Sequence, residues 1–96
     1  MPRYIGLCRF TSKGLATIKE APGRLDLARK LFEEHGARLV DFYLTLGEFD
    51  FVAISEAPDD ETLATVILKA ASQGTFTCET LKCLDEQQYR RIVSAL

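Results

Sequence analysis

A short turn sequence near the middle of the chain most constrains what this chain can fold into. Residues 45–51 (TLGEFDF) lie between two apolar runs that are typical of strands, 37–46 and 50–55. Gly47 supplies the positive φ that a tight reversal requires, and Asp50 can hydrogen-bond the turn backbone. The stretch therefore predicts a β-hairpin with helical patterns outside each arm.

The rest of the chain predicts two more strands and three helices. Residues 3–10 are an apolar strand, and residues 75–84 are a more polar one. Apolar residues at helical spacing predict helices over about 22–35 and 59–73. A last helix follows Asp85, which has capping-box spacing to Gln88. The segment between the first strand and the first long helix is ambiguous, although Thr11 or Ser12 would cap a short helix there.

This order of elements, β-α-β-β-α-β plus a C-terminal helix, predicts a ferredoxin-like α+β fold. Two right-handed crossovers joined by the central hairpin give a four-stranded antiparallel sheet in the order 4-1-3-2. Both long helices then lie on one face of the sheet. A chain of 96 residues fits one domain, residues 1–96.

The other face of this sheet should also be apolar. An antiparallel sheet with one face in water alternates apolar and polar residues, whereas the first three strands carry large apolar residues at both parities. A second copy of the same sheet is the simplest cover, so we expect a homodimer or a larger even-numbered assembly. The last helix covers a sheet edge of its own chain or reaches the partner with its apolar stripe, which comprises Tyr89, Ile92, Val93 and Leu96.

Charge and composition exclude several kinds of partner and cofactor. The net charge of −2 without a basic block argues against nucleic acid. No apolar run is long enough to span a membrane and no signal-peptide pattern is present, so we expect a cytoplasmic protein that does not bind membranes. Three cysteines without a CxxC motif and a single His35 predict no disulfide framework and no metal site. We expect no cofactor, and Cys8, Cys78 and Cys83 are interpreted as small hydrophobic residues.

Polar residues inside the predicted strands are the candidates for catalysis. Strand alternation places Leu39, Asp41 and Tyr43 on one face. Asp41 and Tyr43 would bring a carboxylate and a phenol into one pocket for proton transfer, with Arg9 as a third candidate. A solvated or interface-facing pair is the simpler interpretation of Asp41 and Tyr43.

Cross-strand pairing gives Arg9 a predicted partner. If Leu7 lies opposite Leu81, Arg9 lies opposite Glu79 and the two form an ion pair. An exposed pair contributes only about 0.2–1 kcal/mol, and a structural salt bridge is favoured over a substrate clamp. The candidate ligand-binding side chains are Tyr4, Tyr43, Phe49 and Glu79.

The sequence resembles the small GYD-domain family, named for a glycine-tyrosine-aspartate motif. Gly47, Phe49 and Asp50 match that motif, with Glu48 interposed, and they are its structural residues here. Further matches lie along the chain at 10–14 (FTSKG), 18–19 (IK), Arg24, 41–43 (DFY) and 57–60 (APDD). The resemblance implies the dimeric α/β-barrel superfamily, in which two ferredoxin-like sheets face each other. The chain departs from the motif at Phe49, which cannot supply a phenol.

Three functions are compatible with these features. The first is a homo-oligomeric binding module that holds a small, largely apolar molecule in a cavity of the α/β barrel. The second is a cofactor-independent enzyme, an oxygenase or isomerase that uses Asp41, Tyr43 or Arg9. The third is a purely structural interaction protein, and the fold alone does not choose among them.

Overall fold

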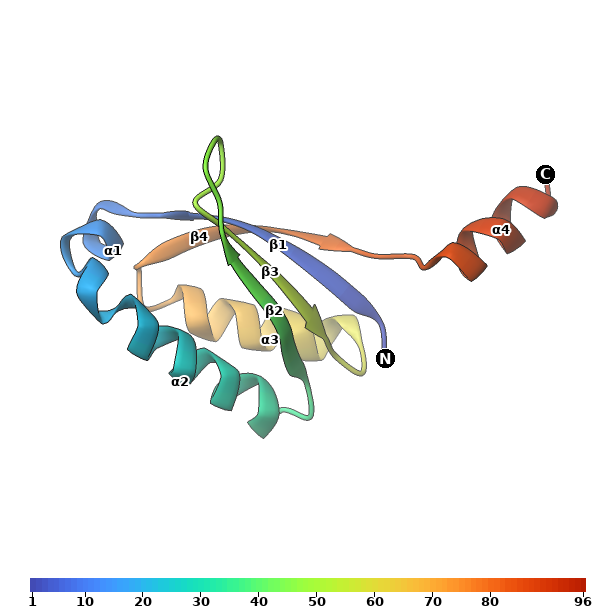
Figure 1. Ribbon diagram of the computed structural model, residues 1–96. Helices are drawn as coiled ribbons and strands as arrows, with labels where there is room; N and C mark the ends of the chain where they lie inside the picture. The colour runs from blue at the N-terminus through green and yellow to red at the C-terminus, as the bar shows by residue number, and fades with distance from the viewer.

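The structure is a computed structural model that describes residues 1–96, and every predicted strand and helix is present (Figure 1). Thr11 caps the short first helix, and Asp85 and Gln88 form the expected capping box. A short 3-10 helix was not predicted. The elements in chain order are β1 (Arg3–Phe10), α1 (Ser12–Ala16), the 3-10 helix η1 (Ile18–Glu20), α2 (Ala21–Glu34), β2 (Arg38–Leu44), β3 (Phe51–Glu56), α3 (Asp60–Ala71), β4 (Phe76–Lys82) and α4 (Glu86–Ser94).

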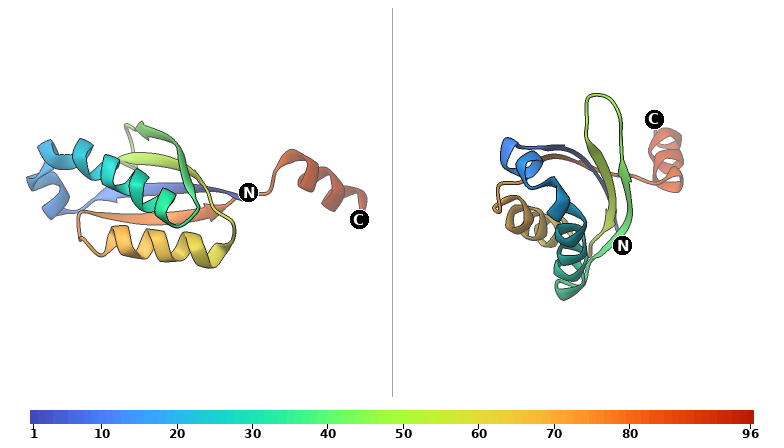
Figure 2. Two further views of the ribbon diagram at one scale, coloured as in Figure 1. Left: turned by 90° about the horizontal axis from the view of Figure 1, so that it is seen from below. Right: turned by 60° about the vertical axis from the view of Figure 1, so that its left-hand side comes forward.

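The four strands form one antiparallel sheet in the order β2-β3-β1-β4. This is the predicted order 4-1-3-2 read from the other edge. Helices α2 and α3 lie on the same face of the sheet, and the opposite face carries no helix (Figure 2). The fold is therefore ferredoxin-like α+β, as the sequence predicted.

The hydrophobic core lies between the sheet and these two helices. Alternate residues of β1 point into it, and Tyr4 and Cys8 are each only 2% exposed. Phe51 lies at the other end of the same face, with its ring centroid 5.1 Å from that of Phe10 and 5.7 Å from that of Phe76. The main core cluster consists of Tyr4, Phe32, Ala37, Ala57, Leu63 and Val66.

The predicted register between β1 and β4 was wrong by two residues. Leu7 lies opposite Glu79 rather than Leu81, and Arg9 lies opposite Thr77. A shift of two residues leaves every side chain on its predicted face, so alternation alone does not detect it. Phe10 pairs with Phe76, and both rings pack near Phe51, which favours the observed register.

A β-bulge in β2 changes another predicted face. Leu39 pairs with Ser55, but Asp41 pairs with Ile54, so the strand holds one extra residue between them. Leu39 therefore packs against the core instead of sharing a face with Asp41 and Tyr43.

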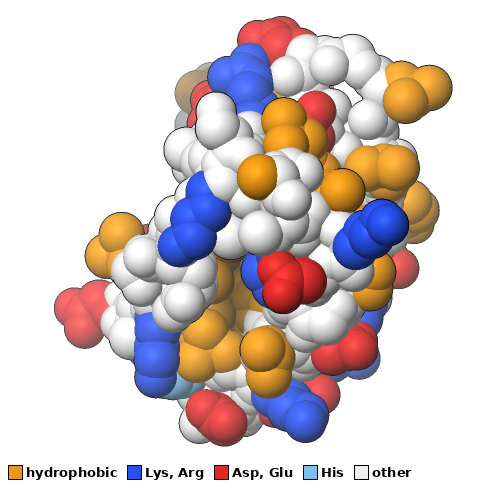
Figure 3. All heavy atoms as spheres, turned by 90° about the vertical axis from the view of Figure 1, so that its left-hand side faces the viewer, with side chains coloured by type: hydrophobic (Ala, Val, Ile, Leu, Met, Phe, Trp, Pro, Cys, Tyr) orange, Lys and Arg blue, Asp and Glu red, His pale blue; other side chains and the backbone are white.

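Helix α4 stands apart from the sheet and its two covering helices, which together we call the body (Figure 1). None of its residues is buried. The end of the body that carries α1 shows apolar side chains only in small groups between charged ones (Figure 3). In this structure no helix combines the length and the hydrophobicity that crossing a membrane would require.

Candidate functional site

Arg9 is held by the hairpin loop and not by β4. Its Nε donates to the backbone carbonyl of Glu48 at 2.9 Å, and its Nη2 lies 2.9 Å from Glu48 Oε1. The guanidinium carbon is 4.7 Å from the centroid of the Phe49 ring, within the range of a cation–π contact. The predicted Arg9–Glu79 ion pair was therefore wrong, because the register places Glu79 beside Leu7.

The residues that match the family motif shape the hairpin and fasten it to β1. Gly47 has φ 127°, a value that residues other than glycine rarely adopt. The Asp50 carboxylate accepts the Phe10 N–H at 2.8 Å, and the Asp50 N–H donates to the Cys8 carbonyl at 2.9 Å. The Asp50 carboxylate thus bonds the neighbouring strand, while its backbone carbonyl accepts the Thr45 N–H across the turn at 2.9 Å.

Asp41 and Tyr43 lie on the open face of the sheet, which is the face without helices. Both are exposed, Tyr43 by 57%, and neither side chain makes a hydrogen bond. An acid–base pair needs a partner or substrate position within hydrogen-bond reach, and none is formed here by the chain itself. The structure therefore brings Asp41 and Tyr43 to one exposed face, and a catalytic role for the two residues stays a prediction.

The open face has an apolar centre and a charged border. The half-buried or exposed apolar side chains at its centre come from β1, β3 and β4. At one border Arg38 lies 2.7 Å and Arg3 3.6 Å from the Glu56 carboxylate. The hydrogen bond from Arg38 lowers the pKa of Glu56. The central residues are Ile5, Leu7, Val52, Ile54 and Leu81.

Tyr4 lies on the other face and so does not share a site with Tyr43. Its hydroxyl donates to Asp60 Oδ1 at 2.6 Å, and Lys82 Nζ lies 3.0 Å from the same oxygen. Burial, with a further contribution from Asp60, raises the pKa of Tyr4 to about 12. The hydrogen bond from Tyr4, followed by that from Lys82, lowers the pKa of Asp60.

Tyr4, Asp60 and Lys82 line a groove between α3 and β4. The groove has a volume of about 350 Å³ and mostly apolar walls. It opens to solvent beside Leu68, which is 70% exposed. Its lining residues are Tyr4, Asp60, Leu63, Ala64, Ile67, Leu68, Thr80 and Lys82.

The sequence did not predict that Asp60 and Lys82 lie beside Tyr4, or that Glu48 lies beside Arg9. In the sequence, Asp60 stands out only as part of the 57–60 (APDD) match to the family. Its contact with Tyr4 joins residues 56 positions apart, and no local pattern signals such a pair. Glu48 was visible only as the residue interposed in the family motif.

The comparison with known families decides where this fold belongs. The GYD domain model matches residues 4–93. The chain belongs to the GYD domain family. One curated relative is 35% identical over 85 residues, covering 88% of this chain and 90% of that protein. It is the "glutamine synthetase and cystathionine beta-lyase binding protein" of Thermus thermophilus.

Solved structures give the same fold at low sequence identity. This GYD domain matches a feast or famine regulatory protein from Mycobacterium tuberculosis, complexed with L-methionine, with a TM-score of 0.68 and 12% identity over 88% of this chain. It spans only 51% of that protein. The leucine response regulatory protein of the same organism gives 0.66 at 14% identity, with coverages of 88% and 51%. A crystal structure of a Thermus thermophilus protein gives 0.57 at 21% identity, and the match covers 88% of this chain and 95% of that one.

Proposed function

We propose that this GYD domain is a protein-interaction domain that binds an enzyme of amino-acid metabolism and pairs with a second copy of itself. The first part is supported by the Thermus thermophilus relative, which is named for binding glutamine synthetase and cystathionine beta-lyase. The match covers almost all of both chains, so the two proteins have one architecture. We propose further that residues 1–96 act as one domain.

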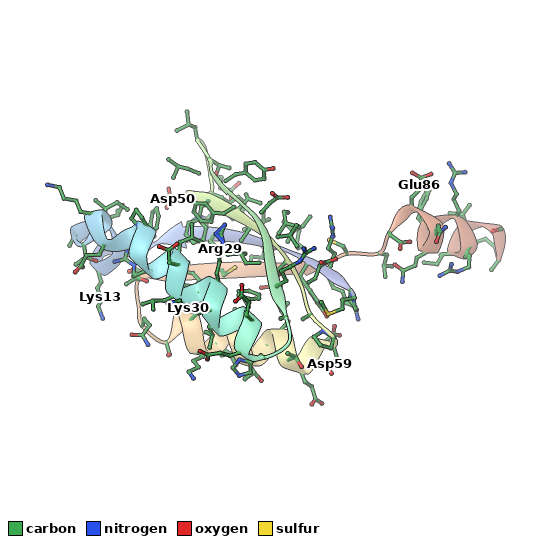
Figure 4. All side chains as sticks on the ribbon, turned by 60° about the horizontal axis from the view of Figure 1, so that its bottom comes forward. Lys13, Arg29, Lys30, Asp50, Asp59 and Glu86 are labelled. Atoms are coloured by element: carbon green, nitrogen blue, oxygen red, sulfur yellow. The ribbon has the colours of Figure 1, made fainter.

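Helix α4 carries the proposed contact with the enzyme. It is amphipathic, and Tyr89, Ile92 and Val93 on its apolar stripe are 63%, 50% and 48% exposed. Glu86 at its start lies far from Asp59 at the start of α3, and the whole helix projects from the body (Figure 4). An amphipathic helix that its own chain leaves uncovered is suited to a hydrophobic groove on another protein.

The open sheet face supports the proposed self-association. Covering its apolar centre contributes about 1.5–3 kcal/mol for each large side chain that becomes fully buried. A two-fold axis would place the same apolar centre and the same charged border on both sides of the contact. A cavity between the two sheets, as expected for an α/β barrel, would exist only in that dimer.

Binding is tested with the purified glutamine synthetase and cystathionine beta-lyase of the organism from which this chain comes. Biolayer interferometry should detect association of at least one enzyme with the full chain. Ile92→Asp should weaken binding at least tenfold, because it places a charge in the apolar stripe. Gln87→Asp, on the other side of α4, is the matched control and should bind normally. Absence of binding to both enzymes would overturn the proposed partners.

Self-association is tested separately by sedimentation. The full chain should sediment as a dimer or larger even assembly at micromolar concentration. Val52→Asp, at the apolar centre of the open face, should yield a folded monomer. Thr65→Asp on the exposed side of α3 should leave the assembly unchanged. A monomeric wild-type chain would overturn the dimer without affecting the enzyme contact assigned to α4.

A second candidate function, binding of a small molecule, is favoured by the groove between α3 and β4. Apolar walls with a few convergent polar groups are typical of ligand sites, and Tyr4, Asp60 and Lys82 supply those groups. Native mass spectrometry of the freshly purified chain should show a bound molecule that is lost in Ala64→Trp, which fills the groove. A freshly purified wild-type chain that carries no bound molecule, or a molecule that stays bound in Ala64→Trp, would count against this candidate.

A further inference from the structure

Two cysteines that the sequence placed on separate strands meet inside the sheet. Cys8 of β1 lies directly opposite Cys78 of β4, and their Sγ atoms are 2.7 Å apart. Cys8 is buried, whereas Cys78 is partly exposed at the edge strand. The pair therefore combines a protected sulfur with one that a small reagent can reach.

The strand register fixes this proximity. At the two ends of the β1–β4 ladder, the Thr11 N–H donates to the Thr75 carbonyl and the Cys83 N–H to the Arg3 carbonyl, so the odd-numbered pairs are the hydrogen-bonded ones. Cys8 and Cys78 consequently form a non-hydrogen-bonded pair, in which the Cα atoms are about 4.5 Å apart and the side chains are closest. That spacing lies within the range of disulfide-bonded cysteines, about 4.4–6.8 Å.

Gly6 leaves room for both sulfur atoms. A Cβ at this position would lie 3.0 Å from Cys78 Sγ and 3.5 Å from Cys8 Sγ. Any side chain at position 6 would therefore crowd the pair and restrict the rotation that bond formation requires. Gly6 lies on β1 two residues before Cys8, so the two residues share the face of the sheet that the helices cover.

The two thiols differ in acidity. The hydrogen bond that Cys8 donates lowers the pKa of Cys78 to about 7, while the same bond, together with burial, raises the pKa of Cys8. The accessible sulfur is thus the better nucleophile near neutral pH, since the thiolate is the reactive form.

We propose that Cys8 and Cys78 are a reversible redox site that a hydroperoxide converts to a disulfide. The Cys78 thiolate attacks the peroxide oxygen, the O–O bond breaks, and Cys78 becomes a sulfenic acid, while the departing hydroxide or alkoxide takes a proton from solvent and leaves as water or an alcohol. Cys8 sulfur then attacks Cys78 Sγ, the S–O bond breaks, and the departing hydroxide takes the Cys8 proton as water. Both sulfurs are oxidised and the peroxide is reduced by two electrons. A dithiol then reduces the disulfide by thiol–disulfide exchange, which restores both thiols and oxidises the dithiol.

The disulfide would fasten an edge strand to the centre of the sheet. The two residues are 70 positions apart, so the bond closes most of the chain into one loop and restricts the unfolded state strongly. β4 leads directly into α4, and the oxidised form therefore holds the base of the proposed interaction helix more firmly.

The test begins with the reduced full chain and one molar equivalent of hydrogen peroxide. Intact-mass spectrometry should show loss of two hydrogen atoms, and peptide mapping should recover a Cys8–Cys78 cross-link with Cys83 free to alkylate. The oxidised chain should melt at least about 8 °C higher, and dithiothreitol should restore the original value.

Two variants separate the site from general thiol oxidation. Cys83→Ser keeps the pair and should oxidise like the wild type. Cys78→Ser should show neither the mass loss nor the shift in melting temperature. Recovery of cross-links that involve Cys83, or conversion of Cys78 to sulfinic acid without a cross-link, would overturn the proposal. Because these readouts need no binding partner, they are independent of the proposed function.

Discussion

The hydroxyl of Tyr4 donates a 2.6 Å hydrogen bond to Oδ1 of Asp60, which joins the buried side of β1 to the first turn of α3. Lys82 on β4 binds the same carboxylate from the exposed side. The elements β1, α3 and β4 thus meet at one carboxyl group. Asp60 also lies where the helix dipole favours a negative charge.

Tyr4→Phe should lower the free energy of unfolding by about 1–3 kcal/mol, because it removes a hydrogen bond to a charged acceptor. The folded chain raises the pKa of Tyr4 from 10.0 to about 12. The contribution of Tyr4 is therefore complete below pH 10.0 and is lost as the pH rises towards 12. Urea denaturation should show the difference between wild type and variant shrinking over that interval. A pH-independent difference would contradict this assignment.

Gly47→Val should destabilise the chain by about 1–3 kcal/mol, since a β-branched residue is strained at a positive φ. The φ of 127° at Gly47 is the basis of this expectation. Gly23→Ala is the control, because a Cβ at position 23 meets nothing within 4 Å and its φ is not positive. Equal thermal melting of Gly47→Val and wild type would show that the hairpin tolerates side chains.

The fold could be predicted because its signals are local. Gly47 between two apolar runs indicates a hairpin, and the spacing of Asp85 and Gln88 indicates a helix start. The register of β1 against β4 has no such local signal. A shift by two residues preserves alternation, and only the packing of Phe10 and Phe76 near Phe51 distinguishes the observed pairing.

The candidate site was harder to predict for the same reason. Arg9 had an acidic partner in the predicted register and a different one, Glu48, in the structure. The Cys8–Cys78 pair follows from the observed register alone, because the predicted register would have separated the two sulfurs. Contacts between distant residues depend on how the strands dock, which the spacing of residues along one strand does not encode.

The revised partner of Arg9 leads to a double-mutant prediction. The Arg9 and Glu48 side chains are 50% and 75% exposed, so their coupling energy should be only about 0.2–1 kcal/mol. The cycle that combines Arg9→Ala with Glu48→Ala should detect this coupling in chemical denaturation. The matched cycle with Glu79→Ala should give none within error. Coupling to Glu79 instead would restore the register predicted from sequence.

Gly14 should be among the least replaceable residues of the chain. A Cβ there would lie 2.0 Å from the Thr75 carbonyl oxygen, which is backbone and cannot rotate away. Gly14→Ala should therefore cost about 3 kcal/mol and weaken the 3.1 Å bond from the Thr11 N–H to the same oxygen. Ser12→Ala, an exposed change in the same helix, should melt within a few degrees of wild type. A normal melting temperature for Gly14→Ala would show that α1 can move away from β4.

Deletion of residues 85–96 tests whether α4 serves the body or another protein. Because no residue of α4 is buried, the shortened chain should retain its free energy of unfolding within about 0.5 kcal/mol when measured at low concentration. Binding to the enzyme partner should be lost, since the apolar stripe is removed. Stability that falls on deletion, and falls more at high protein concentration, would show instead that α4 packs on a second copy of the chain. A loss that does not depend on concentration would mean that α4 returns to its own body, and the enzyme contact would then require another surface.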